Sequence, residues 1–316
     1  MLSIRRKIRK QVFSCWLINR VYNQQLFLSG LIFALTLHAI KPLLKPSFHI
    51  KSASEYNPAN SILLLITGKR HCSFAVMNYL SKELMEFGYY TSNEEEEDYK
   101  KFFEENDTLN TRYYQAAIAY DANETVQIPS AIYKYEDGQL HLDTVYGKDV
   151  HTTVVSENVP GWNLYNVYRL PTSLQSATSW KFLSGKFWSI YSVLLKNHSN
   201  SNGEVMIVDF KTDEFSVLVL KENKLQLAKT FSYSSPEDVL YYLLKICQQL
   251  DLSQQTVKLL LSGLIEKDSA IYRELYKYFI NLDFESLKGE IKLNEALTAH
   301  PEHYYSSISK LAACVS

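Results

Sequence analysis

Three short turns in this sequence carry residue types that bind phosphate or a metal ion. They are Thr67-Gly68-Lys69-Arg70, Asp209-Phe210-Lys211-Thr212-Asp213 and Ser262-Gly263, and each follows a run of apolar residues. Lys69 and Arg70 could contact phosphate as point charges, although a solvated turn is the commoner use of such residues. Asp209 could coordinate a metal ion, although ending a strand and capping the next turn is the commoner role. Glycine matters in such turns because it lets the backbone approach an anion closely.

The composition describes a folded protein with a sizeable core. Of 316 residues, 46% are apolar and 21% are charged, which leaves room for one large or two medium domains. The net charge of −1 argues against broad binding to nucleic acid, which needs a cationic surface. The four cysteines show neither CxxC pairing nor metal-ligand spacing. We therefore expect a reduced, cytoplasmic location and no nucleic-acid partner.

Residues 1–55 are predicted to form an N-terminal extension and linker. Basic residues at positions 5–10 precede an apolar run, Leu26–Ile40, which is shorter than the roughly 20 residues of a bilayer span. One interpretation is an extension that the folded body does not use. The alternatives are a membrane association through residues 5–44, which would place the protein at the inner membrane, and a cleaved signal peptide. The polar stretch Ser47–Asn60 is predicted to be a linker.

The remainder divides at the polar loop Asn197–Gly203 into domains 56–195 and 196–316. The strands predicted in the first domain are Ile62–Ile66, Cys72–Val76, a weak one near Glu86–Thr91, Tyr113–Tyr120, Thr125–Pro129, Val150–Val155 and Leu164–Tyr168. A helix is predicted to start at the acidic run Glu94–Asp98 and to end near Glu105. Short helical structure near Ser130–Tyr135 and a long helix over 170–195, broken at Ser184-Gly185, complete the first domain.

The sequence of the second domain predicts its fold in more detail than that of the first. Three strands (Val205–Asp209, Phe215–Leu220 and Leu225–Phe231) precede a helix, the strand Val257–Leu261, a helix after Asp268 and the strand Leu282–Phe284, and a last helix is predicted over 302–313. Ser235, Pro236 and Asp238 supply a cap, a first-turn proline and a capping box for the first of these helices. The order β-β-β-α-β-α-β is the core of a ribonuclease-H-like unit. Two such units facing each other make an actin-like ATPase. We therefore predict an α/β protein of two ribonuclease-H-like domains with mixed sheets.

Several segments resemble a bacterial family of uncharacterised proteins with an actin-like ATPase fold. They are Asn166–Pro171, Phe187–Tyr191, Pro236–Leu244, Leu261–Ile265 and Glu274–Phe279. The likeness covers roughly residues 55–316. It implies the two-domain architecture and no particular activity.

The nucleotide turns of actin-like ATPases usually read Asp-x-Gly, followed by a hydroxyl residue or glycine, and a later Gly-Gly turn seats the adenosine. The residues that match these positions are Thr67, Gly68, Lys69, Asp209, Lys211, Thr212, Ser262 and Gly263. The first turn lacks its acid, and Lys211 stands where the second turn needs glycine. We therefore predict a degenerate nucleotide site, with no catalytic residue, no metal and no cofactor. Binding of ATP and Mg²⁺ is the alternative.

The aromatic and basic stretch 180–188 is the candidate surface for a partner. Its proposed contacts are Trp180, Lys181, Phe182 and Lys186, in a composition typical of interface hot spots. The competing interpretation places Trp188, Tyr191 and Leu195 in the core. The sequence thus favours a non-enzymatic interaction protein with an unknown protein partner. It would resemble the actin-like platform proteins of pilus and secretion systems in architecture only. An ATPase or phosphotransferase with non-standard phosphate turns is the alternative.

Overall fold

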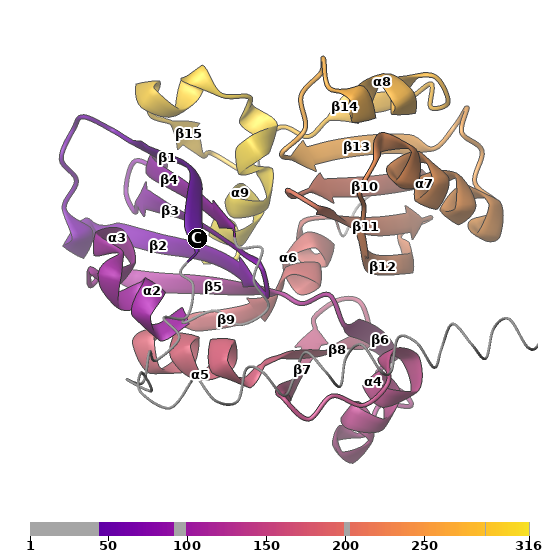
Figure 1. The fold of residues 1–316 in the computed structure, drawn as a ribbon, viewed down its shortest axis with the longest axis horizontal. Coiled ribbons are helices and arrows are strands. Elements are labelled where there is room, and N and C mark those ends of the chain that lie inside the picture. The colour runs from indigo at the N-terminus through magenta and orange to yellow at the C-terminus, as the bar shows by residue number, and fades with distance from the viewer. Residues whose placement is uncertain (1–43, 92–98, 199–202, 288, 316) are drawn as a thin grey trace, which may run out of the picture. The chain divides into compact units, whose positions relative to one another are not determined.

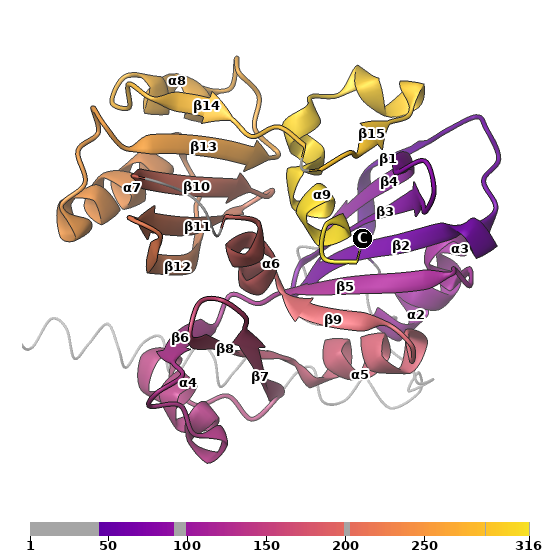
Figure 2. The ribbon, with the colours of Figure 1, turned by 180° about the vertical axis from the view of Figure 1, so that it is seen from behind.

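A computed structural model describes residues 44–91, 99–198, 203–287 and 289–315. These residues form three β-sheets with helices packed on them (Figures 1 and 2). The basic and apolar extension up to residue 43 and the acidic run before Tyr99 lie outside the described residues. Within the described part of the chain, no helix combines the length and apolarity needed to cross a bilayer.

The first large sheet is built around an antiparallel meander. In sheet order its strands are β1 (Lys45–Lys51), β4 (Glu83–Thr91), β3 (His71–Asn78), β2 (Ser61–Gly68), β5 (Gln115–Asp121) and β9 (Lys186–Ser189), and β15 (Lys292–Leu293) also pairs with β4. The helices of this part are α2 (Tyr99–Glu105), α3 (Asp107–Asn110), α5 (Thr172–Lys181) and α6 (Ile190–Asn197). Strand β5 runs parallel to β2, and β9 runs parallel to β5.

The second large sheet repeats this topology. Its strands, in sheet order, are β12 (Lys224–Ser232), β11 (Glu214–Lys221), β10 (Glu204–Phe210), β13 (Lys258–Gly263) and β14 (Leu282–Phe284), and its helices are α7 (Pro236–Leu250) and α8 (Ala270–Tyr276). A meander followed by two parallel strands is thus common to both sheets. The predicted order β-β-β-α-β-α-β is confirmed, and so is the predicted capping box of Ser235 and Asp238 on α7.

A smaller sheet is inserted between β5 and α5 (Figure 1). It consists of β6 (Thr125–Pro129), β8 (Leu164–Pro171) and β7 (Thr152–Val159), with helix α4 (Gly138–Tyr146). Short 3₁₀ turns occupy Pro58–Asn60, Tyr135–Asp137, Glu295–Ala299 and Glu302–Tyr305, and the last helix is α9 (Ser306–Ala312).

The two large sheets share one core and each has a second core of its own. In β2, Ile62, Leu64 and Ile66 face the shared core, whereas the alternate Leu63 and Leu65 face α2 and α5. Strand β10 divides in the same way: Val205 and Ile207 join the shared core, and Met206 and Val208 pack under α7 and α8. This period of two explains why the central strands read as continuous apolar runs.

Helices α6 and α9 fill the shared core. Helix α9 contacts β2 and β5 of the first sheet and β13 of the second, and it also contacts α6. Lys310 on α9 is fully buried, and its ammonium pairs with the buried carboxylate of Glu285. The predicted domain boundaries, 56–195 and 196–316, stay predictions. Two elements of the later stretch, β15 and α9, pack against the first sheet.

Two local predictions were wrong, and one strand was missed. The predicted linker 47–60 contains most of β1, and the short helix predicted near Ser130–Tyr135 is a turn that precedes α4. The break predicted at Ser184-Gly185 in the helix over 170–195 is confirmed, but strand β9, which follows the break and precedes α6, was missed. Strand β9 escaped prediction because its four residues follow Gly185 directly and sit between helix-forming segments.

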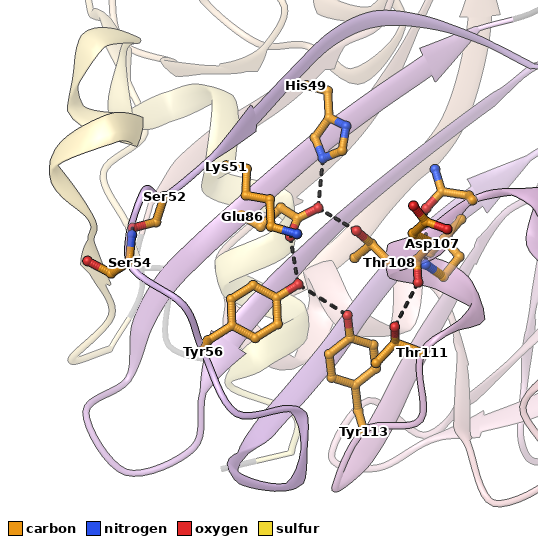
Figure 3. A network of polar contacts seen from close by, with 12 residues as sticks. His49, Lys51, Ser52, Ser54, Tyr56, Glu86, Asp107, Thr108, Thr111 and Tyr113 are labelled. Atoms are coloured by element: carbon orange, nitrogen blue, oxygen red, sulfur yellow. Dashed lines mark hydrogen bonds and ion pairs between the residues drawn. The ribbon is translucent and has the colours of Figure 1, made fainter.

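A buried carboxylate explains why the polar stretch before residue 60 is ordered (Figure 3). Glu86 of β4 is fully buried, and His49 of β1 lies 2.7 Å from its Oε1. Tyr56 donates a 2.6 Å hydrogen bond to Oε2, Thr108 of α3 donates to Oε1, and Lys51 lies 3.3 Å from Oε2. Three polar residues of the predicted linker, His49, Lys51 and Tyr56, are therefore partners of one internal acid.

These donors control the ionisation of Glu86. Burial by itself would raise the pKa of this carboxyl, but the hydrogen bonds from His49, Thr108 and Tyr56, together with the charge of Lys51, outweigh it. The result lowers the pKa from 4.5 to about 2. Because the folded pKa lies below the unfolded one, ionised Glu86 favours the folded state above the unfolded pKa.

We predict that Glu86→Gln lowers the free energy of unfolding at neutral pH by on the order of 3 kcal/mol. The difference from the unaltered protein should shrink as the pH falls from about 4.5 toward 2, because the carboxyl becomes protonated. Denaturant unfolding of both proteins at a series of pH values measures this difference in unfolding free energy. Glu105→Gln, at an exposed position of α2, is the control. A pH-independent difference would contradict the assignment.

Candidate functional site

The two hairpin turns predicted to bind phosphate are tied to each other directly. The turn after β2 carries Arg70, whose guanidinium pairs with the carboxylate of Asp213 in the turn after β10. Next to it, the Asn123 side-chain amide donates a 2.6 Å hydrogen bond to Glu214 at the start of β11. Residues of one unit thus serve as the polar partners of the other.

Lys211 makes the innermost of these links. Its side chain is only 5% exposed, and its ammonium lies 2.5 Å from Oδ2 of Asp121, which is 1% exposed. It also donates a 2.7 Å hydrogen bond to Ser216. Asp121 ends β5 directly beside Gly68 of β2, and the imidazole of His71 lies 3.1 Å from the same Oδ2. The acid of one unit and the base of the other therefore form a buried ion pair.

This pair holds both groups ionised. Burial would raise the pKa of Asp121, but the Lys211 charge and the His71 contact outweigh it and hold that pKa well below its usual range. Burial would likewise lower the pKa of Lys211, but the carboxylates of Asp121 and Asp209 hold it above its ordinary value. A cation and an anion excluded from water at this distance depend on each other.

Asp209 is bound by hydroxyl groups from two elements. Its Oδ1 accepts a 2.8 Å hydrogen bond from Ser262 of β13 and a 3.0 Å hydrogen bond from Ser307 of α9. The parallel pairing of β10 with β13 places Ser262 opposite Asp209. The predicted phosphate turn and the predicted adenosine turn are thus brought together at the carboxyl ends of adjacent strands.

Both glycines of the predicted site are required by packing. A Cβ atom at Gly68 would lie 2.7 Å from the Asp121 carbonyl oxygen and from the His71 ring. Gly263 has φ +75°, and a Cβ there would lie 2.1 Å from the carbonyl oxygen of Phe210. Glycine is needed in each place because backbone or an imidazole fills the space of a side chain.

The other predicted nucleotide residues do not converge on one point. Thr67 is fully buried within β2, whereas Lys69 and Thr212 are exposed. The carbonyl oxygens of Lys69 and Thr212 accept hydrogen bonds from Tyr99 and Tyr233. Sequence reasoning missed Asp121, His71 and Ser307. An acid that ends a strand parallel to β2 was the signal that could have pointed to Asp121.

A small cavity lies between the two turns. We call it the central cavity; Asp121, Asp209, Lys211, Tyr89, Ser73 and Ser307 supply most of its polar lining. Its volume is about 30 Å³, which is room for about two water molecules. Pockets for drug-sized ligands have about 300–1,000 Å³.

The predicted partner surface is only partly a surface. Trp180 is 55% exposed, with the Lys100 ammonium 4.9 Å from its ring centre, and Lys186 is exposed. Lys181 contacts the side chain of Asn110. Phe182 is 7% exposed and packs edge-on against Phe103, so including it in the exposed set was wrong. The role of the other three in partner binding stays a prediction.

The described residues contain no group of three or more His, Cys, Asp and Glu side chains arranged to hold a metal ion. His303, the histidine three residues after His300, does not serve such a group: its Nε2 lies 2.7 Å from the Ile265 carbonyl oxygen, and its ring stacks on Phe284.

Comparison with known proteins identifies the family. The sequence pattern of a family described as "Protein of unknown function (DUF3822)" matches residues 51–282, which is most of the chain. The chain belongs to the DUF3822 family. This confirms the resemblance to an uncharacterised family. A comparison with curated proteins finds no match.

Two solved structures show the fold of this family member. A Bacteroides thetaiotaomicron VPI-5482 protein with an actin-like ATPase fold and unknown function is 18% identical. It has a TM-score of 0.62 over 77% of this chain and 95% of its own. A chain of the PilM–PilN type IV pilus biogenesis complex is 10% identical, with a TM-score of 0.52 over 82% of this chain and 99% of its own. The protein therefore has an actin-like ATPase fold.

We predict strong coupling between Lys211 and Asp121. Lys211→Met leaves a buried carboxylate without its cation, so it should cost about 3–5 kcal/mol of unfolding free energy, and Asp121→Asn should cost a similar amount. The double variant should cost much less than the sum of the two, because neither member of the pair is left without its partner. Chemical denaturation of the four proteins measures the coupling. Additive costs would show that the pair is not formed.

We also predict that Gly263→Ala costs about 3 kcal/mol or more of unfolding free energy, because the added methyl group meets the Phe210 backbone. Gly161→Ala is the matched control: Gly161 has a similar φ of +84°, but nothing lies within 4 Å of its Cβ position. The control should cost only about 1–2 kcal/mol, which is the strain of the left-handed conformation. Equal losses in thermal or denaturant unfolding would contradict the steric argument.

Proposed function

We propose that this protein is a non-enzymatic member of the actin-like fold, a pseudo-ATPase that acts by binding a protein partner in the cytoplasm. The observation that carries the proposal is the buried ion pair of Lys211 with Asp121. Phosphate turns of this fold work by exposing backbone N–H groups to the anion, which requires a residue without a side chain at the position of Lys211. Here that side chain crosses the cleft and meets an acid of the other unit.

The acid of the second turn, Asp209, already accepts internal hydrogen bonds. In the nucleotide site that the fold suggests, Asp209 would orient a metal-bound water molecule. Its Oδ1 instead accepts hydrogen bonds from Ser262 and Ser307. The pair of Arg70 and Asp213 links the same two turns. A nucleotide would have to break these links and enlarge a cavity of about 30 Å³.

Partner binding is supported by the precedent of the fold and by exposed side chains. A protein of the same fold occurs in a complex of pilus biogenesis. In this chain Trp180 and Leu183, at and after the end of α5, are 55% and 85% exposed. A membrane association through residues 5–44, which lie almost wholly outside the described residues, would bring such a platform to the inner membrane.

Isothermal titration calorimetry with ATP and Mg²⁺ tests the proposal. We expect no saturable heat at millimolar nucleotide, because binding must first separate the Lys211–Asp121 pair. We also expect no phosphate release above that of buffer. The alternative function, an ATPase that uses Lys69, Asp209 and Lys211 in a non-standard way, predicts the opposite. A low-micromolar dissociation constant, with hydrolysis abolished by Asp209→Ala but kept in the control Asp213→Ala, would overturn the pseudo-ATPase proposal.

A further inference from the structure

The charges that line the central cavity do not balance. Asp121 and Asp209 each contribute one negative charge and Lys211 contributes one positive charge, so these three side chains together bring a charge of −1 to the cavity. All of these residues are buried. An uncompensated charge removed from water is costly, and proteins pair it or bind a counter-ion.

One oxygen of Asp121 marks where a counter-ion would bind. Its Oδ2 contacts Lys211 and His71, but its Oδ1 is buried and has no hydrogen-bond partner among the described residues. A carboxylate oxygen in that position is strongly unfavourable, because it has lost water and gained no donor. Asp209, Ser73 and Tyr89 bring further oxygen atoms to the same cavity.

The size and ligands of the cavity select the kind of ion. A volume of about 30 Å³ has room for a bare metal cation with about one water molecule. Carboxylate and hydroxyl oxygens suit a hard cation rather than zinc, which prefers cysteine and histidine ligands. The neighbouring Lys211 ammonium repels a divalent ion more strongly than a monovalent one.

We propose that the central cavity binds one monovalent metal cation through Asp121 Oδ1 and the Asp209 carboxylate. The two carboxylates then lie between two cations, the bound ion and the Lys211 ammonium, and the lining becomes neutral. The ion would stabilise the folded state in proportion to its occupancy. This site depends on the cavity and its charges, and it does not depend on whether the protein binds ATP.

Thermal unfolding of the full chain in different chlorides tests the proposal. Sodium, potassium and N-methylglucamine chloride are compared at equal ionic strength, so that general screening is the same in all three. We expect the melting temperature to be about 2–4 °C higher in sodium or potassium chloride than in N-methylglucamine chloride. Equal melting temperatures in the three salts would mean that the cavity holds water only, and would overturn the proposal.

Two matched variants locate the ion. Asp209→Asn keeps an acceptor for Ser262 and Ser307 but makes the cavity lining neutral, so the difference between salts should disappear. Asp213→Asn removes the same charge from the outer pair with Arg70, away from the cavity, and should keep the difference. An Asp209→Asn variant that keeps the difference between salts, or an Asp213→Asn variant that loses it, would contradict the assignment.

Sodium-23 NMR of the unaltered protein provides a test that needs no variant. Exchange between water and a buried site broadens the sodium signal, and added potassium, competing for the same site, should sharpen it in a saturable manner. Broadening that rises linearly with protein concentration and does not respond to competing potassium would indicate only diffuse attraction. That outcome would overturn the proposal even if Asp209→Asn failed to fold.

Discussion

The buried ion pair between Lys211 and Asp121 is the constraint on which the arrangement of the two units depends. Each partner alone would be a strongly unfavourable buried charge, so neither the end of β5 nor the turn after β10 is stable in this place without the other. The pair does not need to add much net stability to have this effect. It fixes which residues face each other across the cleft, and Arg70 with Asp213, Asn123 with Glu214 and the central cavity follow from that register.

Internal acids recur where segments from distant parts of the sequence meet. Glu86 gathers donors from β1, the loop after it and α3, and Glu285 pairs with Lys310 of α9. In both cases burial would raise the pKa of the carboxyl, but the partners lower it to about 2. A buried carboxylate accepts only partners in a suitable geometry, whereas apolar packing tolerates many arrangements of neighbouring side chains. Such networks favour one arrangement of the chain over its near competitors.

The sequence predicted the parts of the fold that obey a local period. The apolar runs of β10 and β11 and the cap at Ser235 are visible within a few residues, and they were confirmed. Strand β1 was missed because its order depends on Glu86, which lies more than thirty residues away. For the candidate site, Asp209, Lys211 and Gly263 were selected and line the central cavity, although their role in nucleotide binding stays a prediction. Their partner Asp121 was not selected, because only the pairing of β5 with β2 brings it there.

The pairing of β15 with β4 has a consequence for how the protein is made. Strands β1 and β15 lie on the same side of β4, opposite its Glu86–Thr91 and Glu83–Leu84 segments, so this edge is closed by residues separated by about 240 positions. During synthesis the Glu83–Leu84 segment of β4 therefore lacks its partner strand until residues 292 and 293 have left the ribosome. Unpaired backbone groups of this kind are a site at which another chain can add a strand.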